Sequence, residues 1–129
     1  MINYGFKKEV SRPFGEAEKV VTEELKKKGF GILTKIDVKE KFKEKLGIDF
    51  PNYVILGACN PPLAHKAILA EQDIGLLLPC NVVIYEKEGK TVLDVMKPST
   101  AMGMIGNEEL RKIATEVEVI LKEVFDSVN

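Results

Sequence analysis

The stretch of sequence at residues 80–97 reads CNVVIYEKEGKTVLDVMK. Apolar and β-branched side chains dominate residues 82–85 and again residues 91–97, as in β-strands. Between them, residues 87–90 read KEGK, a composition typical of a tight turn. The two runs therefore predict an antiparallel hairpin, so at least part of the sheet is antiparallel.

Upstream of the hairpin, the spacing of apolar residues predicts three more strands and three helices. Residues 53–59 are apolar without alternation, as expected for a strand that is covered on both faces or lies near the sheet centre. Asp37, with Glu40 three positions later, predicts a helix start, and so does Asn60 before Pro61. The expected strands are 2–10, 30–36 and 53–59, and the expected helices begin at 14, 38 and 61 and end near Gly29, Gly47 and Gln72.

Downstream of the hairpin, Pro98 ends the last strand, and residues 99–106 predict a loop of small residues and methionine. Asn107 then caps a long final helix, whose apolar stripe from Leu110 to Val124 must lie on the sheet. The element order is β-α-β-α-β-α-β-β-α, without a repeat or a long linker. It predicts one domain over residues 1–129, folded as a two-layer α+β sandwich.

The composition excludes several classes of function. The chain has 19 Lys and Arg against 20 Asp and Glu, so it lacks the positive field that attracts nucleic acid or anionic membranes. No segment has the length and hydrophobicity of a membrane span, and the first residues do not resemble a secretory signal. We therefore expect a cytoplasmic protein with no nucleic-acid or membrane partner, whose two cysteines are thiols.

Three segments carry a family resemblance. They are residues 29–38, the run LGACNPPLA at 56–64, and the run LLPCNVVIYE at 77–86. Together they resemble the family known as domain of unknown function 302, and the similarity extends over nearly the whole chain. The resemblance implies a largely antiparallel, curved five-stranded sheet with a long C-terminal helix, similar to the TATA-binding-protein-like class of folds. It also implies a homodimer, but it points to no particular activity, and the cofactor stays unknown.

Cys59 and Cys80 are the centre of the candidate site. Cys59 ends an apolar strand and directly precedes a helix start, where unpaired N–H groups and the helix dipole are expected to lower the pKa of its thiol. Each cysteine is followed by an asparagine, Asn60 or Asn81. The alternative is that both thiols are buried apolar fillers, as free cysteines often are. The candidate ligand-binding residues are Cys59, Asn60, Pro61, Cys80 and Asn81.

Two further residues are candidates for catalysis beside the thiols. His65 follows Cys59 by six positions and could act as its base, although a helical surface histidine is the simpler interpretation. Glu86 shares strand parity with Cys80, so it is either a partly buried acid or a solvated strand end. Two cysteines and one histidine do not supply the four ligands of a structural zinc site, and no metal site is predicted.

Three hypotheses of function follow from these residues. The first is a small-molecule binding domain with its pocket near the two cysteines. The second is a thiol-dependent redox or transfer enzyme, with Cys59 as nucleophile and Cys80 as resolving thiol. The third is a structural or dimerisation module. The first and second require that the sheet brings both thiols to one hollow.

Overall fold

A computed structural model describes residues 2–129 and contains one five-stranded sheet in the order β1-β5-β4-β3-β2. All four strand pairings are antiparallel. The predicted hairpin joins β4, the central strand, to β5, which lies beside it. The α+β fold with an antiparallel sheet and a long C-terminal helix is thereby confirmed. The strands are β1 Gly5–Val10, β2 Gly31–Asp37, β3 Tyr53–Cys59, β4 Cys80–Lys87 and β5 Lys90–Met96.

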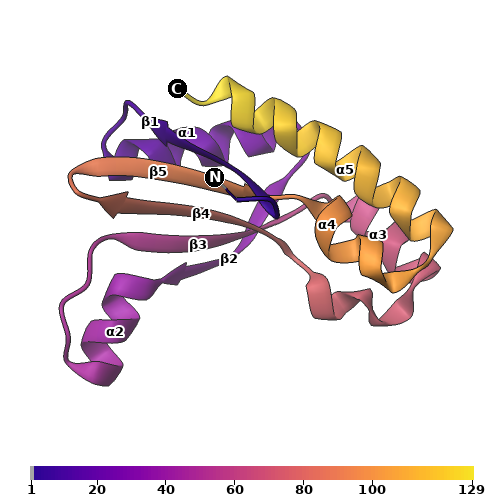
Figure 1. Cartoon of the computed structure of the whole chain (residues 1–129), viewed down its shortest axis with the longest axis horizontal. Coiled ribbons are helices and arrows are strands. Elements are labelled where there is room, and N and C mark those ends of the chain that lie inside the picture. The colour runs from indigo at the N-terminus through magenta and orange to yellow at the C-terminus, as the bar shows by residue number, and fades with distance from the viewer. Residues whose placement is uncertain (1) are drawn as a thin grey trace.

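The helices form a layer on one face of this sheet. Figure 1 shows α5 running along the top of the molecule with α1 behind it, while α3 and α4 lie together at one end. Helix α2 stands apart at the opposite end, below β2, and buries none of its residues. The helices are α1 Phe14–Lys27, α2 Val38–Leu46, α3 Pro61–Ala70, α4 Pro98–Met102 and α5 Glu108–Ser127, with 3-10 turns η1 Gln72–Leu77 and η2 Gly103–Ile105.

Three predicted caps begin helices in the structure. The side chains of Asp37, Asn60 and Asn107 each accept a hydrogen bond from the backbone N–H three residues on, at 3.0, 3.2 and 3.0 Å. Each bond satisfies one of the N–H groups that a helix start leaves without a partner. The short polar residues read from the sequence therefore fix where α2, α3 and α5 start.

Strand alternation divides the sheet into a helix face and an open face. On β4 the side chains of Cys80, Val82 and Ile84 are buried against the helices. Between them, Asn81 is exposed, and Val83 and Tyr85 are half-buried on the other side. The helix face, together with the inner stripe of α5, makes up the core, and the open face is covered by none of α1, α3 and α5.

The structure corrects three predicted boundaries. The expected loop at 99–106 contains α4 and η2, because Pro98 suits the first turn of a helix and the Glu118 carboxylate accepts from the Ser99 N–H at 3.0 Å. The third helix ends at Ala70, whose carbonyl accepts from Asn107 Nδ2 at 2.8 Å. The first strand begins at Gly5, three residues later than expected.

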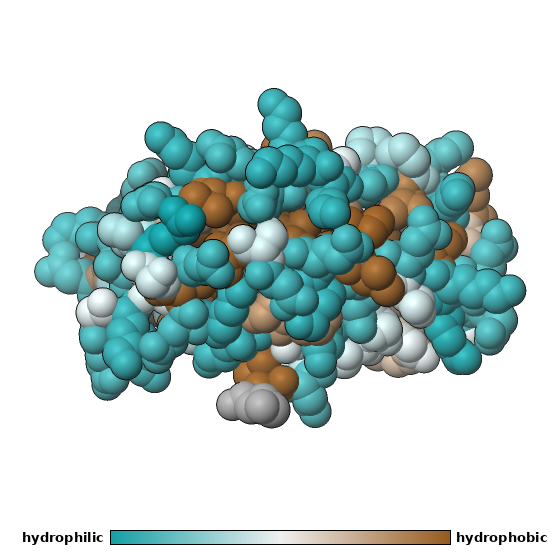
Figure 2. Space-filling view, turned by 90° about the horizontal axis from the view of Figure 1, so that it is seen from above, coloured by the Kyte–Doolittle hydropathy of each residue, from teal (hydrophilic) through white to brown (hydrophobic). Residues whose placement is uncertain are grey.

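Seen from above, the surface is mainly hydrophilic, and apolar side chains emerge in patches between the hydrophilic ones (Figure 2). Some of these patches lie toward the end of the molecule where Figure 1 shows α3 and α5. Across the described part of the chain, no helix combines the length and the hydrophobicity needed to span a bilayer.

Candidate functional site

A cavity of about 300 Å³ lies at the end of the molecule where β3 stops and β4 starts. Its floor is the sheet, at Ala58 and Cys80, and its walls are α3 and the first half of α5. Helix α4 contributes Met102, and the segment before β4 contributes Pro79. The cavity thus lies where α3 packs against α5 at this end of the core.

Small residues create this space. Four alanines line it: Ala58 on β3, Ala64 and Ala67 on α3, and Ala114 on α5. An alanine at an inward position leaves a gap that a larger apolar residue would fill, and surrounding side chains close such gaps only partly. The other lining residues are almost all hydrocarbon: Phe30, Leu33, Leu63, Ile68, Leu78, Pro79, Pro98, Met102, Ile113 and Val117, with Cys59, Asn60 and Cys80.

Both thiols line the cavity, and both are held in the neutral form. Burial raises the pKa of Cys59 above its ordinary value. Burial, with a smaller contribution from the nearby Cys59, raises the pKa of Cys80 to about 11. Neutral thiols are weak nucleophiles, because the thiolate is the reactive form.

The expected lowering of the Cys59 pKa by the start of α3 is therefore wrong. Pro61 and Pro62 occupy the first positions of the helix and have no N–H group to offer. The N–H of Leu63, the next donor, is already bound by the Asn60 side chain at 3.2 Å. The residues that predict the helix start, Asn60 and Pro61, therefore also leave Cys59 without a free backbone N–H group to stabilise its thiolate.

Asn60 is expected to contribute to stability through this cap. Asn60→Ala should lower the free energy of unfolding by about 1 kcal/mol, because the Leu63 N–H loses its acceptor. Asn60→Ser keeps an uncharged acceptor oxygen and should stay within about 0.5 kcal/mol of the parent protein. Urea unfolding of the three proteins measures the difference, and an equal loss in both variants would show that the cap is not the source.

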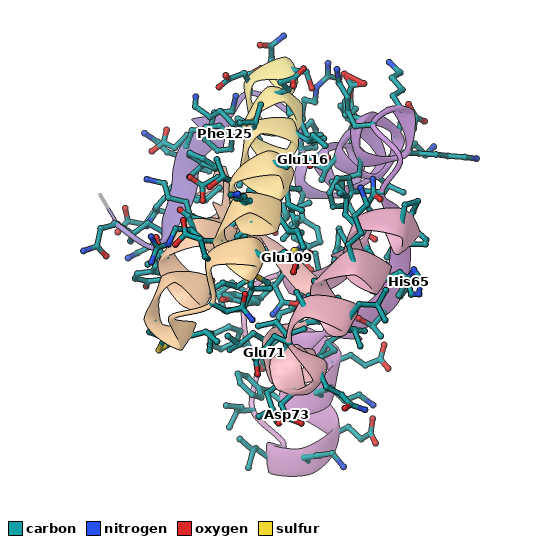
Figure 3. The ribbon with its side chains drawn as sticks, turned by 90° about the vertical axis from the view of Figure 1, so that its right-hand side faces the viewer. His65, Glu71, Asp73, Glu109, Glu116 and Phe125 are labelled. Carbon is teal, nitrogen blue, oxygen red and sulfur yellow. The ribbon has the colours of Figure 1, made fainter. Side chains whose placement is uncertain are left out.

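The other residues proposed from the sequence lie outside the cavity. Asn81 points to the open face of the sheet, because it alternates with the inward-facing Cys80. Pro61 is exposed at the start of α3. His65 is exposed on the outer side of α3, where it points away from α5 (Figure 3). Glu86 is half-buried six residues along β4 from Cys80, and its carboxylate accepts from Asn52.

The structure therefore brings together Cys59, Asn60 and Cys80 and separates the remaining candidates from them. In residues 2–129 no group of three or more His, Cys, Asp or Glu side chains could hold a metal ion. Without His65 or a carboxylate beside it, neither thiol has a side-chain base at the cavity. What the arrangement offers chemically is an apolar, uncharged space.

The cavity reaches the surface beside two exposed apolar side chains. Leu33 of β2 is 66% exposed and Ile68 of α3 is 42% exposed, although both also line the cavity. Large apolar side chains at the rim of a cavity are typical of a site that admits apolar ligands.

Comparisons with known proteins identify relatives without assigning an activity. The family model described as domain of unknown function DUF302 matches residues 6–128. A crystal structure of an uncharacterized conserved DUF302 protein from Bacillus stearothermophilus is 33% identical, covers 99% of this chain and 100% of its own, and superposes with a TM-score of 0.92. No curated protein matches the chain.

Proposed function

The chain belongs to the DUF302 family, which is defined without a function, and we propose from its cavity that it binds a small, uncharged, mostly hydrocarbon molecule. The observation that carries this proposal is a cavity of about 300 Å³ whose lining side chains, apart from Asn60, Met102 and the two neutral thiols, are hydrocarbon. Concave apolar spaces of this size are where proteins bind small ligands.

The size of the cavity limits the ligand. A dry cavity of about 150 Å³ in another protein accepts benzene, and a water-sized group takes about 30 Å³ of liquid volume. A volume of about 300 Å³ therefore suits on the order of ten non-hydrogen atoms. Two fused aromatic rings or a short branched hydrocarbon have this size.

The chemistry of the walls limits the charge of the ligand. A carboxylate or phosphate would need donors, but the start of α3 offers none at Pro61 and Pro62 and has its Leu63 N–H already bound. No lysine, arginine, aspartate or glutamate lines the cavity within residues 2–129. Burying an unpaired charge there would be strongly unfavourable, so the ligand is neutral.

A fluorescent probe of matching size tests the proposal. The chain has no tryptophan, so the emission of 1-aminonaphthalene can be followed without that background. We expect 1-aminonaphthalene to bind saturably, with a blue shift of its emission. We expect 1-aminonaphthalene-5-sulfonate, which adds a charged group to the same rings, to bind at least about tenfold more weakly than 1-aminonaphthalene.

Filling the cavity should abolish this binding. Ala67→Phe places a ring in the space between α3 and the sheet, whereas Leu69→Phe adds a ring on the exposed side of the same helix. We expect loss of probe binding in Ala67→Phe alone, with both variants still folded by circular dichroism. Undiminished binding in a folded Ala67→Phe protein would reject the cavity as the site.

The enzyme hypothesis receives less support. A nucleophilic or redox thiol at neutral pH needs a lowered pKa, and the pKa values of Cys59 and Cys80 are both raised by burial. The two sulfur atoms serve better as soft, polarisable wall groups, which make favourable contacts with aromatic ligands.

A further inference from the structure

A second hollow, of about 530 Å³, lies on the open face of the sheet and contains all three tyrosines of the chain. Tyr53 and Tyr85 are directly opposite each other on β3 and β4, and their rings stack with centroids 5.4 Å apart at 14°. Tyr4 is 64% exposed at the side of the hollow. We call this the open-face hollow, and it is separated from the cavity by the sheet.

Asp94 of β5 has a buried carboxylate oxygen that a ligand's hydrogen-bond donor would satisfy. Its Oδ1 atom is buried and has no hydrogen-bond partner among residues 2–129. Native proteins satisfy nearly all buried polar atoms, and each exception requires an explanation. Burial also raises the pKa of the Asp94 carboxyl group. A hydrogen-bond donor on a bound ligand would remove the free-energy cost of burying this oxygen without a partner.

Lys7 supplies the complementary charge. It lies directly opposite Asp94 on the neighbouring strand, which places the two Cβ atoms about 4.5–5.5 Å apart. Its ammonium group nevertheless makes no ion pair within 4.0 Å in the described part of the chain, and Nζ lies 5.9 Å from the centre of the Tyr85 ring. The Tyr85 hydroxyl is the polar neighbour of Lys7, and its hydrogen bond raises the pKa of the Lys7 ammonium group. The hollow therefore presents one negative and one positive group side by side, without an ion pair between them in the described residues, beside aromatic rings.

We propose that the open-face hollow binds a small zwitterion of the α-amino-acid class. The ligand's ammonium group lies at Asp94, its carboxylate at Lys7, and an apolar or aromatic side chain packs on the tyrosine rings. A simple cation would be repelled by Lys7, and a simple anion by Asp94. An α-amino acid carries its ammonium and carboxylate groups on one carbon atom, and this short separation of the two charges matches the cross-strand spacing of the two residues. This site is independent of the proposed function of the cavity.

Isothermal titration calorimetry with L-phenylalanine tests the proposal. Two analogues isolate the charges: 2-phenylethylamine lacks the carboxylate, and 3-phenylpropionate lacks the ammonium group. We expect L-phenylalanine to bind saturably and each analogue to bind at least about tenfold more weakly. Asp94→Asn and Lys7→Gln should each weaken L-phenylalanine binding by about tenfold or more.

A matched control and an independent measurement keep the test decisive. Glu9 lies on β1, on the same face as Lys7, and is outside the hollow, where it pairs with Lys90 at 3.6 Å. Glu9→Gln should leave binding unchanged, as should Ala67→Phe in the separate cavity. The proposal is overturned if no heat is detected up to about 10 mM ligand, or if the analogues bind as well as L-phenylalanine. It is also overturned if light scattering shows a dimer that Asp94→Lys dissociates, because a second copy would then cover the hollow.

Discussion

Replacement of Gly57 by alanine is expected to lower the free energy of unfolding by about 3 kcal/mol. Gly57 lies on β3, where a Cβ atom would fall 2.1 Å from Thr34 Oγ1 and 2.6 Å from Pro79 Cγ. Thr34 can rotate its hydroxyl away, but the proline ring is rigid and belongs to the segment that lines the cavity. Either β3 or that segment must therefore move to admit a single methyl group.

Gly15→Ala is the matched control for this experiment. A Cβ atom at Gly15, in the first turn of α1, meets nothing within 4 Å. The free energy of unfolding of Gly15→Ala should be equal to that of the parent protein or up to about 1 kcal/mol higher, because alanine favours helix formation. Chemical denaturation of both variants measures the contrast. Equal stability of the two would mean that the contact of Pro79 with β3 is not as close as described.

Alkylation of Cys80 by iodoacetamide is expected to be slow and to accelerate without a plateau between about pH 8 and pH 10. With a pKa of about 11, against an ordinary value of 9.0, its thiolate fraction near pH 8 is about 100-fold smaller than that of a free cysteine. A more basic thiolate is somewhat more nucleophilic, so about tenfold of this difference should remain in the rate. Below its pKa, the rate should rise about tenfold for each pH unit.

The single variants Cys59→Ser and Cys80→Ser separate the two thiols. With Cys59 removed, the rate for Cys80 should follow this steep profile, and unfolding in urea should restore the faster rate of an ordinary thiol. With Cys80 removed, the apparent pKa of Cys59 should lie above its ordinary value, since burial raises it. A plateau at or below about pH 8 for either thiol would indicate an activated nucleophile and would favour a thiol-dependent enzyme.

The architecture could be predicted from the sequence because its signals are local. The hairpin turn at 87–90, the caps at Asp37, Asn60 and Asn107, and the stripe of α5 each depend on a few neighbouring residues. Strand order depends on long-range pairing, for which the sequence has no comparable signal. Helix α4 was missed because its five residues are too few for an apolar period to be recognised.

The site was predictable only in part. Cys59, Asn60 and Cys80 surround one cavity, but Asn81 follows an inward-facing residue on a strand and must face the other side of the sheet. The cavity walls from α5 were missed, although Ala114 in its apolar stripe was a usable signal, since a small residue there leaves space. The open-face hollow depends on the pairing of β1 with β5, which places Lys7 beside Asp94.

A crystal soaked with 2-bromonaphthalene would show whether the cavity accepts a neutral hydrocarbon ligand. The bromine atom gives an anomalous signal, which locates the ligand without reference to its ring density. We expect one strong bromine peak between Ala67, Cys80 and Ala114, and the loss of this peak in crystals of Ala67→Phe. A peak elsewhere on the molecule, or none in the parent protein, would contradict the proposal.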